Sequence, residues 1–144
     1  MPLPNSMNTE KGRAFQQKAA EVLSQHFGVE FQKEYSFPIG HPPKEHKFDL
    51  VSLDRKYVGE SKNYSWTETG NVPSAKMGFV NEAVFYLQHV PPTVHRFVVM
   101  RRDTHPKRGE SLAEYYYRAN RHLLNGVFVV EIDLKTEAVR EFGR

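Results

Sequence analysis

The sequence contains no cysteine, and this absence excludes disulfide bonds and cysteine-ligated zinc sites. It also lacks any apolar run of the ~20 residues that a membrane-spanning helix requires. The segment from Met1 to Asn8 is polar and contains proline, unlike the apolar core of a signal peptide. We therefore expect a cytoplasmic protein without a membrane partner.

The sequence also has little excess of positive over negative charge, since its 20 basic and 17 acidic residues leave a formal charge of +3. A charge of this size does not by itself indicate nucleic acid binding. The 144 residues, 39% hydrophobic and 26% charged, are typical of one globular domain with its own core. We expect a flexible N-terminus over residues 1–8 and a single domain over residues 9–144.

Three segments carry apolar residues at helical spacing, and Ser or Thr, Gly and Pro mark their ends. The predicted helices are Thr9–Gly28, Ser74–His89 and Glu110–Leu124, with Thr9 and Ser74 as N-caps. Their predicted buried positions are Phe15, Ala19, Val22, Leu23 and Phe27 in the first helix, Met77, Val80, Val84 and Leu87 in the second, and Leu112, Tyr115, Tyr116, Ala119 and Leu123 in the third.

Strand patterns occupy the intervals between these helices. A strand over Val29–Phe37 leads into a proline-rich segment, Pro38–Glu45, which is predicted to be a loop. Next comes a tight hairpin of Lys47–Leu53 and Lys56–Lys62, and the later strands are predicted at Arg96–Met100, Val127–Ile132 and, at an edge, Glu137–Phe142. Short turns favour antiparallel pairing and helical crossovers favour parallel pairing, so the order predicts an α/β fold with a mixed sheet.

The predicted hairpin carries two carboxylates and one ammonium group on neighbouring strands. Asp49 lies on the first strand and Glu60-Ser61-Lys62 on the second. Glu60 and Lys62 share one face because side chains alternate along a strand, and cross-strand neighbours such as Asp49 lie within about 5 Å. Carboxylate oxygens are hard ligands for a divalent cation. The pattern therefore indicates a metal site of the kind that hydrolyses phosphodiesters.

Position distinguishes this acid-x-lysine triplet from the others in the chain. Triplets also begin at Glu45 in the proline-rich loop, at Asp54 in the hairpin turn and at Asp133 after a late strand. Only the triplet at Glu60 directly follows a strand that carries an aspartate. The alternative interpretation is a surface ladder of opposite charges on a basic interaction protein.

These residues resemble the PD-(D/E)XK nuclease superfamily. The resemblance rests on Phe48-Asp49-Leu50-Val51, on Val58-Gly59-Glu60-Ser61-Lys62 and on the helix motif Gly12-Arg13-Ala14-Phe15-Gln16. It extends over roughly Lys11 to Met100 and implies a restriction-endonuclease-like α-β-β-β-α-β core, to which this chain adds a helix and a strand. The implied activity is that of an endonuclease that cleaves DNA with Mg²⁺ or Mn²⁺.

By this resemblance, Asp49, Glu60 and the Ser61 carbonyl bind the metal, and Lys62 positions the attacking water or helps to deprotonate it. Gln16 stands where the first helix of the superfamily carries an acid, so this auxiliary catalytic position brings no charge. Glu21 does not replace it, because it lies about 140° away around the helix. A non-catalytic nucleic-acid-binding module on the same fold therefore stays open as an alternative.

Basic residues also gather outside the hairpin. Arg101, Arg102, Lys107 and Arg108 lie close together, and we expect them and Lys76 to contact DNA phosphates, with RNA left open. The alternative is a solvated loop. Trp66, near Tyr64, is expected either to stack on nucleic acid or to be partly buried against the second helix. So small a unit is compatible with a homodimer or a larger complex.

Overall fold

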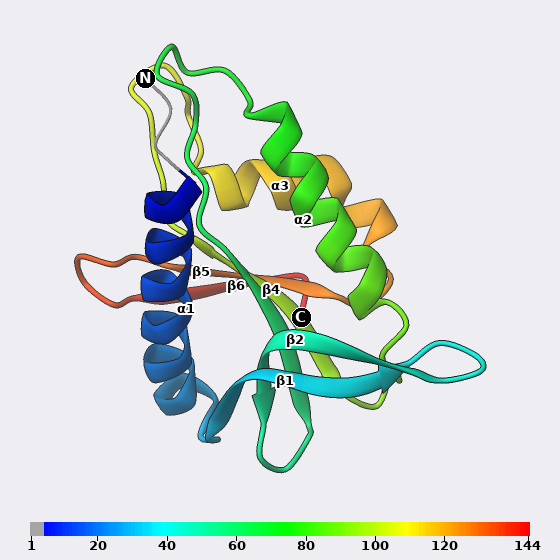
Figure 1. The fold of residues 1–144 in the computed structure, drawn as a ribbon. Coiled ribbons are helices and arrows are strands. Elements are labelled where there is room, and N and C mark those ends of the chain that lie inside the picture. Colours follow the sequence, from blue (N-terminus) through cyan, green and yellow to red (C-terminus); the bar gives the residue numbers. More distant parts are fainter. Residues whose placement is uncertain (1–4) are drawn as a thin grey trace.

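The computed structural model describes the backbone of residues 5–144 and the side chains of residues 10–144. This part of the chain forms three α-helices and one six-stranded mixed sheet, which confirms the predicted mixed α/β class and order of elements. The elements are α1 (Asn5–Phe27), β1 (Phe31–Ile39), β2 (Lys44–Ser52), β3 (Tyr57–Lys62), α2 (Ser74–Leu87), β4 (His95–Arg101), α3 (Leu112–Asn120), the 3-10 turn η1 (Arg121–Leu123), β5 (Phe128–Ile132) and β6 (Val139–Phe142) (Figure 1).

The strands lie in the sheet in the order of the sequence, from β1 to β6. The pairs β1–β2, β2–β3 and β5–β6 are antiparallel, whereas β3–β4 and β4–β5 are parallel. The parallel pairs are those whose connections contain α2 and α3, as crossover geometry requires. The β1–β2 hairpin projects beyond the other strands (Figure 1).

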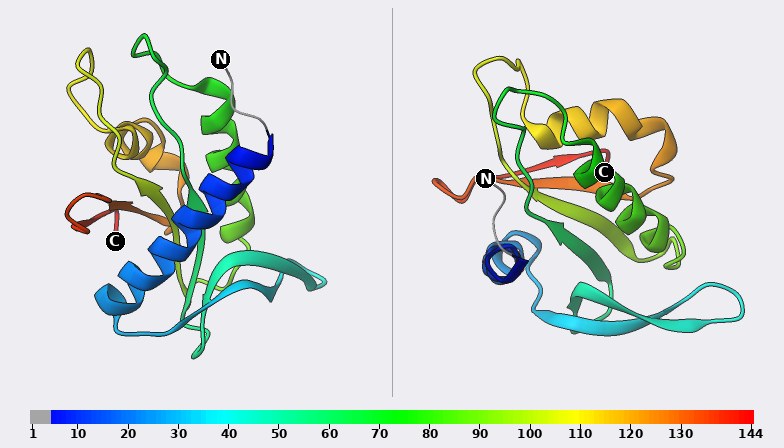
Figure 2. Two further views of the ribbon diagram at one scale, coloured as in Figure 1. Left: turned by 60° about the vertical axis from the view of Figure 1, so that its left-hand side comes forward. Right: turned by 45° about the horizontal axis from the view of Figure 1, so that its top comes forward.

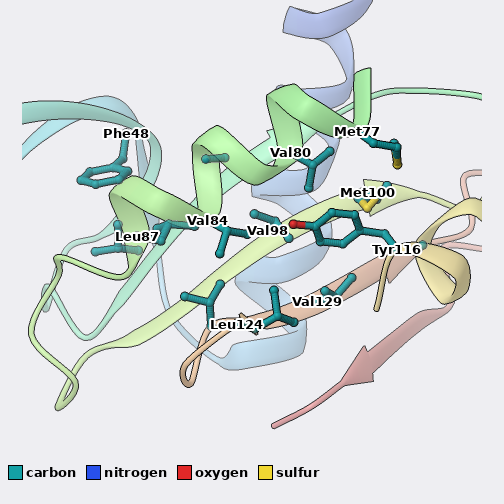
Figure 3. Packing of buried hydrophobic residues seen from close by; sticks show 14 of the residues in the cluster. Phe48, Met77, Val80, Val84, Leu87, Val98, Met100, Tyr116, Leu124 and Val129 are labelled. Carbon is teal, nitrogen blue, oxygen red and sulfur yellow. The ribbon is translucent and has the colours of Figure 1, made fainter. Parts of the chain in front are cut away.

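Helices cover both faces of the sheet, with α1 on one face and α2 and α3 on the other (Figure 2). On the α1 face, Phe15 and Leu23 are buried against Phe97 and its neighbours. On the opposite face, side chains of α2 meet Val98 and Tyr116 (Figure 3). Burial of these two apolar layers fixes the helices against the sheet and so fixes the place where β2 and β3 meet.

Several predicted boundaries are wrong at the ends of elements. Helix α1 begins at Asn5 and not at Thr9, because residues 5–9 contain no glycine or proline that would stop it; residues 1–4 of the predicted flexible segment lie outside the described residues. The predicted loop Pro38–Glu45 is too long, because Pro38 and Ile39 belong to β1, Lys44 and Glu45 to β2, and only residues 40–43 form the turn. Strand β1 lies at an edge of the sheet, where proline is tolerated, and it includes Pro38.

The start and end of the later helices also differ from prediction. Ser74 is the first residue of α2 and Pro73 precedes it as the cap. Ser111 caps α3 instead, since its side chain and that of Glu114 form a reciprocal capping box. The predicted core residue Leu123 is 57% exposed, because α3 ends at Asn120 and the chain turns through η1.

Candidate metal and phosphate site

Asp49 lies at an irregular point of β2. Phe48 belongs to the apolar layer under α2 and Leu50 to the layer under α1, although residues two apart share a face in a regular strand. Glu34, which stands between the β1 partners of Phe48 and Leu50, has a positive φ of 51°. The sheet is therefore distorted on this side of Asp49, and its backbone does not follow the regular pleat.

The carboxylates of Asp49 and Glu60 each accept a backbone hydrogen bond from the opposite strand. The N–H of Asp49 donates to Oε2 of Glu60 at 3.1 Å, and the N–H of Ser61 donates to Oδ2 of Asp49 at 2.8 Å. The Ser61 hydroxyl donates to the same Oδ2 atom at 3.2 Å. The register expected from the sequence is therefore present, and it brings Asp49, Glu60 and Ser61 together.

Glu60 is buried next to a second acid. Its side chain is 9% exposed, and its pKa is raised to about 9, first by burial and then by the negative charge of Asp49 and a hydrogen bond between the two carboxyl groups. The charge of Lys62 opposes this rise in pKa. No described basic side chain forms an ion pair with either acid. The pair therefore lacks a matching positive charge and is suited to a proton or a cation.

A groove of about 560 Å³ lies beside the pair, where the end of β3 meets the first turns of α1 and α2. Its cationic lining residues are Lys11, Lys62, Lys76 and Arg101, and no acidic side chain of the described residues lines it. Gly12 leaves its wall open, since nothing lies within 4 Å of the place a Cβ would take. Gln16 lies one helical turn further on the same face of α1 and is partly buried.

Most of the basic stretch after β4 contacts the protein itself. Arg101 donates to Asn63 at 2.8 Å and to Asp103 at 3.1 Å, and Arg102 donates to Glu131 at 3.2 Å. Lys107 is exposed. The prediction treated these cations alike, whereas the structure ties Arg101 and Arg102 to other side chains and places Arg101 and Lys76 in the groove.

Arg108 and Trp66 form a separate internal contact. The Arg108 guanidinium lies 4.1 Å from the centre of the Trp66 ring, which also meets Tyr115 of α3 edge-on at 5.4 Å. Trp66 is only 5% exposed. The prediction that it could stack on nucleic acid is therefore wrong, and the alternative of burial is correct, although the contacts come from Arg108 and from Tyr115 of α3 and the prediction named the second helix.

Sequence reasoning missed two charged residues near the pair. Lys11 lines the groove, and its position directly before the Gly12 motif was the available signal. Glu82, exposed on α2, lies close enough that its charge acts together with that of Asp49 on His46 and Tyr64. No spacing in the sequence shows that Glu82 faces this part of the sheet, because the relation depends on how α2 packs.

In the described part of the chain, no three or more histidine, cysteine or acidic side chains group closely enough to hold a metal ion. The candidate centre therefore rests on two carboxylates, as the glutamine at position 16 led us to expect. None of the helices in this part combines the length and apolarity that crossing a membrane requires. Comparison with known proteins gives no match to a family profile, a curated protein or a solved structure.

Proposed function

We propose that the protein is a small Mg²⁺-dependent endonuclease that hydrolyses DNA phosphodiester bonds on a restriction-endonuclease-like core of the PD-(D/E)XK type. The observation that carries the proposal is the pair of buried Glu60 and partly buried Asp49, which has no described ion-pair partner and adjoins a basic groove. The order of elements from α1 to β4 is also that of the proposed core.

The donor set of the pair fits a hard divalent cation. Asp49 and Glu60 offer carboxylate oxygens that are within hydrogen-bonding reach of each other, and we assign the Ser61 carbonyl as a further ligand. Mg²⁺ or Mn²⁺ at this place would supply a Lewis acid that polarises the scissile phosphate. Its charge would also replace the proton that the buried pair otherwise favours.

Lys62 is the residue that we expect to act directly on the reacting groups. It lies on the same strand face as Glu60 and lines the groove, so it is placed to contact a phosphate bound there. There it can orient the attacking water and stabilise negative charge that develops on the phosphate. Lys11 and Lys76 hold neighbouring phosphates in the groove, and Gln16 can hydrogen-bond the water without adding charge.

The test is cleavage of plasmid and oligonucleotide DNA with Mg²⁺, with Mn²⁺ and with a chelator. We expect cleavage only with metal, and a loss of at least about 10²-fold in Lys62→Ala with DNA binding retained. Lys135→Ala is the matched control, because Lys135 ends another acid-x-lysine triplet, is exposed and does not line the groove. Cleavage that persists in chelator, or that falls equally in both variants, contradicts the proposal.

A non-catalytic nucleic-acid-binding module is the second candidate, favoured by the uncharged Gln16 and by the presence of only two carboxylates in the described site. Binding that weakens steeply with salt, without cleavage under either metal, would establish this function. Absence of both binding and cleavage would instead favour a charge ladder on an interaction protein.

A further inference from the structure

A patch of aromatic side chains borders the groove on the side of α2. Phe79 of α2 is 48% exposed, and Tyr64 lies partly buried in the segment that follows β3. The ammonium group of Lys76 lies 5.4 Å from the centre of the Tyr64 ring and 5.7 Å from that of Phe79. Lys76 therefore contacts both rings, and the three side chains form one surface with apolar rings and a positive charge.

This surface adjoins the acidic pair as well as the groove. Tyr64 and Lys76 both line the groove. Burial raises the pKa of Tyr64, and the charges of Asp49 and Glu82 raise it further, which places the phenol near the Asp49 carboxylate. If the groove lysines hold the phosphates of a nucleic acid, its bases lie next to Tyr64 and Phe79.

A second aromatic pair joins β2 and α2. The His46 ring stacks on Tyr86 with 4.2 Å between ring centres and 15° between planes. Tyr86 lies two helical turns after Phe79 and on the same face of α2. The charge of Asp49 also acts on His46, so this stacked pair and Tyr64 both lie near the same carboxylate.

We propose that Phe79 and Tyr64 form a stacking surface for unpaired bases, and that the substrate contains a single-stranded segment. Aromatic rings stack on bases of any sequence, and cations in the same groove hold the backbone. In a duplex the faces of the bases are covered by their neighbours, so rings on this surface reach only bases that are unpaired. This inference rests on the proposed function, because it names the form of the nucleic acid that the site cleaves.

The first experiment measures binding without cleavage. Fluorescence anisotropy in chelator compares a labelled oligodeoxynucleotide with the duplex of the same sequence. We expect the single strand to bind at least about tenfold more tightly, and Phe79→Ala to weaken single-strand binding by about fivefold or more without weakening duplex binding. Phe85→Ala is the matched control, since Phe85 is 58% exposed on the same helix but lines the separate cavity between α2 and α3.

Equal affinity of the wild type for both forms, or unchanged single-strand affinity in Phe79→Ala, overturns the inference. Equal losses in Phe79→Ala and Phe85→Ala also overturn it, because general apolar adhesion would then account for the effect. Cleavage of the same oligonucleotides with Mg²⁺ and Mn²⁺ separates this inference from the proposed function. Cleavage of duplex and single strand at equal rates contradicts the stacking surface but supports the nuclease function. Binding that depends on Phe79, without any cleavage, supports the stacking surface but contradicts the nuclease function.

Discussion

Two buried glutamates on the same face of the sheet have opposite surroundings. Glu131 of β5 is 1% exposed, and it accepts hydrogen bonds from Arg102 at 3.2 Å, from Arg140 at 2.8 Å and from the Ser111 hydroxyl. Glu60 of β3 is 9% exposed, and its neighbours are the backbone N–H and the carboxyl group of Asp49. Glu131 is paired with two arginines, whereas Glu60 lies next to a second acid, Asp49.

We interpret the difference as that between a structural carboxylate at Glu131 and the metal ligand that we propose at Glu60. At Glu131 the two guanidinium groups link β4, β5 and β6, so the buried charge holds the sheet edge together. At Glu60 the same sheet leaves a buried acid without a counterion, which costs free energy of folding. The uncompensated glutamate is therefore the one that we propose to bind a cation.

The largest expected effect is on catalysis at the uncompensated glutamate. Glu60→Gln keeps the shape of the side chain but removes a charged oxygen ligand, so we expect Mg²⁺-dependent cleavage to fall by about 10³-fold. Glu131→Gln should leave the rate per folded molecule unchanged. Initial rates on labelled DNA check this, and near-wild-type cleavage by Glu60→Gln would remove the reason to call it functional.

The next effect is on stability, and it has opposite signs at the two positions. Glu131→Gln leaves Arg102 and Arg140 short of a counterion, so we expect the free energy of unfolding to fall by about 2–4 kcal/mol. Glu60→Gln relieves an unfavourable contact and should raise it by about 1–2 kcal/mol at about pH 8 in chelator. Urea denaturation measures both free energies. Destabilisation of similar size in the two variants would contradict the proposed difference between Glu60 and Glu131.

A third effect concerns the backbone directly before Glu60. A Cβ at Gly59 would collide with the Phe97 ring, so Gly59→Ala should lower the free energy of unfolding by about 1–3 kcal/mol. In contrast, Gly78 of α2 has open space, and Gly78→Ala should raise it by about 0.5–1 kcal/mol. Thermal unfolding of both variants shows whether β3 is fixed as tightly as the structure indicates.

The last expected effect is a pH dependence that arises from Glu60. Its folded pKa of about 9 exceeds the ordinary value of 4.5, so the folded state holds a proton that the unfolded state loses first. Without metal, stability should therefore fall as the pH rises through this window. The change should be smaller in Glu60→Gln, which isolates this group from the histidines. If the stability of the wild type and of Glu60→Gln changed equally over this pH range, Glu60 would not be the origin of the pH dependence.

The sequence predicted the parts of the fold that depend on local pattern. Apolar spacing placed Phe15, Leu23, Val80 and Leu87 in the core, and the short turn placed Asp49 across from Glu60. These features follow from helix and strand periods over a few residues. They are the features that the structure confirms.

The remaining parts depend on contacts between distant segments, which periodicity does not encode. The groove joins Lys11, Lys62 and Lys76 from three elements, and the ion pairs of Glu131 use arginines from β6 and the residue after β4. The burial of Trp66 under Arg108 likewise required the packing of α3. Of the five cations that the sequence predicted to contact nucleic acid, only Lys76 and Arg101 line the groove, together with Lys11 and Lys62.

Thermal unfolding with and without excess Mg²⁺ at about pH 8 tests most directly whether the Asp49–Glu60 pair is a cation site. Because a ligand that binds only the folded state stabilises it, the account predicts that Mg²⁺ raises the Tm of the wild type by several degrees. The rise should be absent in Glu60→Gln and retained in Glu131→Gln. An equal rise in the wild type and Glu60→Gln, or none in the wild type with either Mg²⁺ or Mn²⁺, would contradict the account.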